Sequence, residues 1–170
     1  MRVYLPATIG MLRRLEADQE FAPVSGTGFA LTPALRESYT AGDTEELEYA
    51  ALMDAARASL RLIAAEHEDS SEDAKEPARR VVVSADVEGA TLRPDLDVAV
   101  VRLAGPVAML QIAAVHVDAE DAEEAVTAAA AVIDAADLGD PDAEFTLGEA
   151  EDHELAWYAV QELPFFLELL

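Results

Sequence analysis

Apolar residues recur along this chain at two spacings, one typical of strands and the other of helices. Short apolar runs bounded by Gly, Pro or polar residues predict strands at residues 1–5, 29–31, 79–87, 98–103 and 112–117. Stripes with a period near 3.6 predict two long helices, at 44–65 and 119–136, and shorter ones at 9–18 and 33–42. The pattern predicts one α+β domain over residues 1–170, an α/β sandwich with a mixed sheet of about five strands, of which a ferredoxin-like arrangement is the leading example.

The predicted junctions between strands and helices carry residues that suit a helix N-cap. Thr8, Thr32 and Asp118 each stand where a strand gives way to a helix. Pro33 follows Thr32 at the first helical position, which proline favours. These local signals predict where the helices begin.

Three segments lack a clear period. Residues 66–77 form a polar, acidic run, which predicts a mobile loop within the domain. Residues 142–153 are also acidic and are predicted to be irregular. Residues 155–161 fit either a strand or a helix, and the pattern leaves both open.

The distribution of charge along the chain indicates which partners the protein can bind. The 170 residues carry 35 acids and 11 bases, a net charge of −24, and all the bases lie in residues 1–102. Residues 103–170 hold 16 acids and no Lys or Arg. Such a surface repels nucleic-acid phosphates and anionic lipid, so we expect neither nucleic acid nor a membrane as a direct partner. With no targeting segment and no long apolar stretch, we expect a cytoplasmic protein.

The acidity itself has two interpretations. The favoured one is solubility, because an acidic proteome produces acidic proteins in general. The other is an acidic face that docks a basic protein or mimics nucleic acid. The absence of cysteine excludes disulfides, thiol catalysis and Cys-ligated metals.

Catalytic and cofactor motifs are missing from the sequence. It contains no GxGxxG, no P-loop and no GxSxG, so we expect no cofactor and lean against an enzyme. One possible ligand or metal site combines His116 and Asp118, on one face at the end of a strand, with Asp86 and Thr8 at the ends of others. The favoured alternative makes Asp118 a helix cap and His116 a partly buried strand residue bonded to backbone, so no metal is assigned.

The C-terminal segment is unusually apolar for a chain end. Trp157 and Tyr158 precede a tail that holds Phe165, Phe166 and Leu169. Such a tail has to be buried. It either packs on its own domain or forms an interface with a partner or a second subunit, and both possibilities stay open.

Several segments together carry a family resemblance. They are residues 1–8 (MRVYLPAT), 28–36 (GFALTPALR), 55–61 (AARASLR), 114–118 (AVHVD), 134–140 (DAADLGD), the pair 157–158 (WY) and 162–165 (ELPF). The chain resembles a family of small acidic actinobacterial proteins known only as a domain of unknown function. The resemblance implies kinship and a GC-rich host, and it implies no activity, cofactor or catalytic residue.

These observations favour a non-enzymatic cytosolic protein-interaction or regulatory module, which could be homodimeric. One alternative is a small-ligand binder or enzyme with a pocket at the strand ends near His116 and Asp118. Another is an acidic mimic of nucleic acid.

Overall fold

The computed structural model describes all 170 residues, apart from the side chain of Glu72. Its main feature is a seven-stranded sheet in the order β5-β6-β3-β1-β4-β8-β9. The strands are β1 (Arg2–Ala7), β3 (Thr27–Phe29), β4 (Val81–Asp86), β5 (Thr91–Leu92), β6 (Val100–Arg102), β8 (Ile112–Asp118) and β9 (Leu155–Tyr158). A separate two-stranded sheet pairs β2 (Glu20–Phe21) with β7 (Val107–Ala108).

Every described strand pair is antiparallel, so the expected mixed sheet of about five strands is wrong. The ferredoxin-like arrangement is not shown either. Strands alternating with helices suggested parallel crossovers, but the central pairs β1–β4 and β4–β8 both run antiparallel. The α+β class is confirmed.

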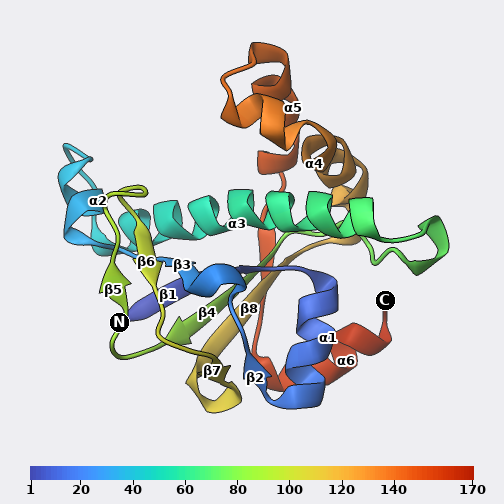
Figure 1. Cartoon of the computed structure of the whole chain (residues 1–170), viewed down its shortest axis with the longest axis horizontal. Coiled ribbons are helices and arrows are strands. Elements are labelled where there is room, and N and C mark those ends of the chain that lie inside the picture. The colour runs from blue at the N-terminus through green and yellow to red at the C-terminus, as the bar shows by residue number, and fades with distance from the viewer.

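Helices cover both faces of the large sheet. They are α1 (Ile9–Asp18), α2 (Pro33–Glu37), α3 (Thr44–Asp69), α4 (Glu123–Asp137), α5 (Pro141–Glu151) and α6 (Leu163–Glu168). The long helix α3 crosses one face, and the α4–α5 hairpin lies beyond it (Figure 1). Helices α1 and α6 lie side by side on the opposite face.

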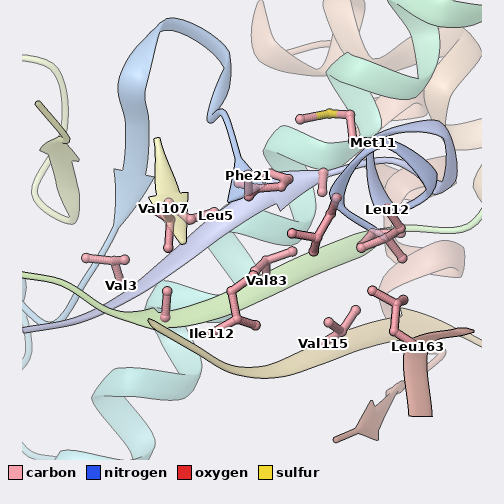
Figure 2. Close-up of a cluster of buried hydrophobic side chains, with 14 of the residues drawn as sticks. Val3, Leu5, Met11, Leu12, Phe21, Val83, Val107, Ile112, Val115 and Leu163 are labelled. Atoms are coloured by element: carbon pink, nitrogen blue, oxygen red, sulfur yellow. The ribbon is translucent and has the colours of Figure 1, made fainter. Parts of the chain in front are cut away.

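Alternation along the central strands divides the interior into two layers. Val3 and Leu5 of β1 join α1 and α6 in one buried cluster, while Tyr4 between them faces α3. Figure 2 shows the first cluster, in which Leu12 of α1 and Leu163 meet Val83 and its neighbours on the strands. The apolar tail therefore contributes to the same core as the first strand.

Helix α5 corrects the irregular segment expected at 142–153. Asp140 caps it, Pro141 occupies its first turn, and buried Ala143, Leu147 and Ala150 face α4. Two of these three buried residues are alanines, and acidic residues surround them in the sequence. The buried stripe of the helix therefore gives only a weak hydrophobic signal.

None of the described helices is both long and apolar enough to cross a lipid bilayer.

Helix α3 also runs further than predicted, to Asp69, and a 3₁₀ turn follows at Glu72–Ala74. The segment 66–77 is therefore partly helical. One anchor is Glu66, whose carboxylate accepts a 2.6 Å hydrogen bond from the Thr8 hydroxyl. The mobility of the remaining loop stays a prediction.

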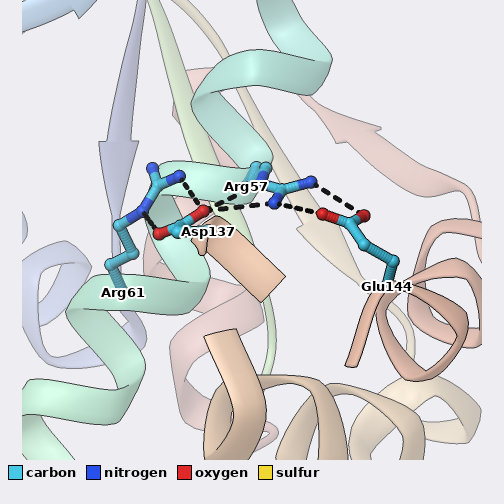
Figure 3. A network of polar contacts seen from close by, with 4 residues as sticks. All are labelled: Arg57, Arg61, Asp137 and Glu144. Carbon is cyan, nitrogen blue, oxygen red and sulfur yellow. Dashed lines mark hydrogen bonds and ion pairs between the residues drawn. The ribbon is translucent and has the colours of Figure 1, made fainter. Parts of the chain in front are cut away.

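An ion-pair network fixes the hairpin to α3. Asp137 at the end of α4 accepts hydrogen bonds from Arg57 and Arg61, and Arg57 also pairs with Glu144 of α5 (Figure 3). The bonds from Arg61 and Arg57 hold the pKa of Asp137 below its usual value. Because the four side chains form one network, they orient the hairpin more firmly than an isolated surface pair would.

Candidate functional site

The structure does not gather the four predicted site residues. Asp86 lies opposite Arg2, whereas Val81, at the other end of β4, lies opposite Val117. Asp118 and Thr8 both lie at the Val81 end of β4. Asp118 follows Val117, and Thr8 follows Ala7, which is the partner of Val81 on β1. Antiparallel pairing separates Asp86 from Asp118, since the carboxyl end of one strand meets the amino end of the next. The expected common pocket at the strand ends is therefore wrong.

Asp118 is buried in an ion pair and does not cap a helix. Its carboxylate accepts hydrogen bonds from the Arg80 guanidinium at 2.8 and 2.9 Å and from the Arg80 amide at 2.7 Å. Helix α4 begins later, with Ala122 at its N-cap, because a 3₁₀ turn intervenes. Both carboxylate oxygens of Asp118 are thus occupied within the fold.

Thr8 has the predicted capping role. Its hydroxyl oxygen accepts a 3.2 Å hydrogen bond from the Met11 amide at the start of α1. Among the described side chains, no three His, Asp or Glu residues are grouped so that they could hold a metal ion.

His116 does lie in a groove, on the face of β8 that looks toward α3. Its Nε2 is 2.7 Å from the Ser84 hydroxyl on β4, so its partner is a side chain where a backbone group was expected. Burial, together with the positive charge of Arg2, lowers the pKa of His116 to about 4, so the imidazole is neutral at pH 7. Ser84 also lines the groove but is only 1% exposed, so a substrate has almost no access to its hydroxyl.

The groove has a volume of about 270 Å³ and lies between the first half of α3 and four strands of the sheet. Three aromatic rings line it, Tyr4 from β1, Tyr49 from α3 and Trp157 from β9. Trp157 lies directly opposite His116 and is 62% exposed, and Tyr49 is 56% exposed. Tyr4 and Tyr49 lie 45 residues apart in the sequence, and Trp157 lies more than a hundred residues further on, so the tertiary fold alone creates this aromatic surface.

Two glutamates of α3 complete the groove, Glu45 and Glu48. The Tyr4 hydroxyl donates a 3.0 Å hydrogen bond to Glu48. Burial and the neighbouring carboxylate raise the pKa of Tyr4 to about 12, so the phenol stays protonated and keeps this bond. The glutamates thus add negative charge to an aromatic surface.

The one arginine of the groove is neutralised locally. Arg2 makes two hydrogen bonds to the Asp86 carboxylate, at 2.8 and 3.1 Å. This pairing also lowers the pKa of Asp86. Asp86, expected as a ligand, instead balances the cation beside the groove.

The predicted interface residues divide into two groups. Phe166 is buried with its ring centroid 4.7 Å from that of Tyr158, so the tail packs on its own fold. Phe165 and Leu169 point outward and are 69% and 87% exposed. They line a second cavity of about 470 Å³, with Tyr158 on its wall.

Comparison with known protein families shows which family the chain belongs to. A model described as "Family of unknown function (DUF6912)" matches residues 1–167. The chain belongs to this family. Kinship with a family of unknown function is thereby confirmed, whereas actinobacterial origin stays a prediction. Neither the curated proteins nor the solved structures gave a match.

Sequence reasoning missed the two tyrosines and both glutamates of the groove, namely Tyr4, Tyr49, Glu45 and Glu48. Tyr49 offered one local signal, since it is a large aromatic residue on the polar side of the predicted helix. Tyr4 and Glu48 offered none, because their pairing joins a strand to a helix 44 residues away.

Proposed function

We propose that this chain is a non-enzymatic protein-interaction module that docks a basic segment of a partner protein in the groove of Tyr4, Tyr49 and Trp157. The observation that carries the proposal is the combination of these three rings with Glu45 and Glu48 in one groove. Aromatic faces attract ammonium and guanidinium groups, and nearby carboxylates strengthen that attraction.

The local charges favour the same occupant. Arg2 is held by Asp86, and His116 is neutral at pH 7, so neither opposes an incoming cation strongly. The net charge of −24 attracts a basic partner over long range and speeds its association. The groove then supplies the close contacts that distinguish it from the rest of the acidic surface.

Catalysis receives less support from this geometry. Ser84 and His116 form a hydrogen-bonded pair, yet the serine is buried, and among the described contacts the imidazole donates no hydrogen bond to a carboxylate that would orient it. A serine nucleophile requires an accessible hydroxyl and an oriented base. The pair is better explained as a polar contact between strands.

Trp157 makes the proposal directly measurable, because it is the only tryptophan in the chain. Titration with octa-arginine is expected to change Trp157 fluorescence, and octa-glutamate is expected to leave it unchanged. The affinity should fall steeply as salt rises, because the contacts are exposed and charged. No change in fluorescence, or an affinity independent of salt, would refute the proposal.

A matched pair of variants separates the groove from general acidity. Glu45→Gln and Glu124→Gln each remove one exposed carboxylate, the first in the groove and the second on α4. Octa-arginine should bind less tightly to Glu45→Gln than to Glu124→Gln. Equal losses would mean that the cation binds by overall charge alone.

A further inference from the structure

Strand β9 has an open edge. It is the last strand in the sheet order and pairs only with β8, so no strand of the described chain lies along its outer side. Its four residues, Leu155–Tyr158, include no proline or charged residue that would protect an edge. Unpaired amide and carbonyl groups on such an edge can bind an extended segment of another chain.

The two faces of β9 each carry a concave surface. Trp157 lies beside the groove on the α3 side, whereas the next residue, Tyr158, lies on the wall of the 470 Å³ cavity on the α6 side. Successive residues of an added strand point to opposite faces. One set of its side chains would therefore meet the Trp157 ring, and the other would meet Tyr158, Phe165 and Leu169.

Charge decides which segment fits this edge. Glu154 and Glu162 flank β9, and residues 103–170 carry 16 acids and no Lys or Arg. The one base on the cavity wall, Arg79, is paired with Glu123 at 2.9 Å. A second copy would bring the acidic residues that flank one β9 toward those that flank the other, which is unfavourable. A basic segment would place opposite charges there.

From these observations we propose that β9 binds an antiparallel extended segment of a basic partner, with cationic residues over Trp157 and apolar residues in the cavity of Tyr158, Phe165 and Leu169. This inference rests on the proposed function and specifies how the partner binds. An antiparallel segment would match the sheet, because all of its existing strand pairs are antiparallel.

The probe is a peptide of four arginine–valine repeats, compared with an isomer in which the arginines precede the valines. Both have the same charge, but only the alternating peptide can place one residue type on each face. We expect it to bind about tenfold tighter, since only alternation lets all the arginines meet one face of β9 and all the valines meet the other. Amide hydrogen exchange in β9 should slow when the alternating peptide binds.

N-methylation tests the pairing itself. One derivative of the alternating peptide carries methyl groups on the arginine amides and another on the valine amides. Antiparallel addition presents only one of these sets to β9, so one derivative should lose about tenfold or more in affinity and the other should bind nearly unchanged. Equal effects of the two derivatives would overturn the proposal.

Leu169→Glu and Leu138→Glu form the matched variants, because both leucines are almost fully exposed and only Leu169 lines the cavity. We expect weaker binding of the alternating peptide to Leu169→Glu only. If octa-arginine binds but alternation, N-methylation and Leu169→Glu have no effect, strand addition is wrong and the proposed function stands. If no basic peptide binds, both are wrong. If ultracentrifugation shows a dimer whose β9 is protected without peptide, the edge belongs to a second copy and the inference is wrong.

Discussion

Replacing Asp118 by alanine removes one half of the most deeply buried ion pair in the described chain. The side chains of Arg80 and Asp118 are 1% and 0% exposed. The change leaves the Arg80 guanidinium with one remaining hydrogen bond, 2.8 Å to the His153 carbonyl, and removes the side-chain partner of the Arg80 amide. A buried charge without its counter-ion is strongly unfavourable.

The expected cost follows from this burial. Breaking a buried pair by removing one partner costs about 3–5 kcal/mol of unfolding free energy. For a chain of this size, about 1 kcal/mol lowers Tm by roughly 2–4 °C, so Tm should fall by about 6–20 °C. The pair also closes the end of the β4–β8 ladder, where the Asp118 amide donates to the Arg80 carbonyl at 3.1 Å.

Urea unfolding of Asp118→Ala, followed by circular dichroism, measures this loss. The matched control is Asp86→Ala, which breaks the exposed pair with Arg2 and should cost less than about 1 kcal/mol. A loss below about 1 kcal/mol for Asp118→Ala, or one equal to that of the control, would refute the assignment of Asp118 to a structural role.

Three further predictions test the tail, the groove and a turn. Phe166→Ala should cost about 3–5 kcal/mol in urea unfolding because its ring is buried, whereas Phe165→Ala, at an exposed position, should change stability by less than about 0.5 kcal/mol; similar values would contradict the tail packing. His116 should titrate near pH 4 by NMR, below the ordinary value of 6.5 for the unfolded chain, so the unfolded state binds the proton first. Its contribution to stability is then complete above pH 6.5 and is lost as pH falls toward 4, and His116→Gln should remove that part of the pH dependence; a midpoint near 6.5 would contradict the burial. Gly26→Ala should destabilise the fold by about 1–2 kcal/mol or more, because Gly26 has a φ of +67° and an added Cβ would lie 2.9 Å from a backbone carbonyl oxygen, whereas Gly105→Ala meets open space and should be nearly neutral.

Short-range features of the structure were predictable from the sequence. Thr8 caps α1 and Thr32 caps α2, because a capping bond joins residues only three positions apart. Burial of the tail was expected from its apolarity, and it holds for Phe166 but not for Phe165 and Leu169, which are exposed. Periodicity failed at α5, where two of the three buried residues are alanines that differ little from their surroundings in hydrophobicity.

Only the tertiary structure decided how the strands pair and what they bring together. Strand direction depends on which distant segments meet, and a strand has the same local pattern whether its neighbour runs parallel or antiparallel. Antiparallel pairing separated Asp86 from Asp118 and left His116 opposite Trp157. The groove beside Trp157 therefore has no signature within any single segment, because its rings and carboxylates become neighbours only when β1, α3 and β9 pack on one sheet.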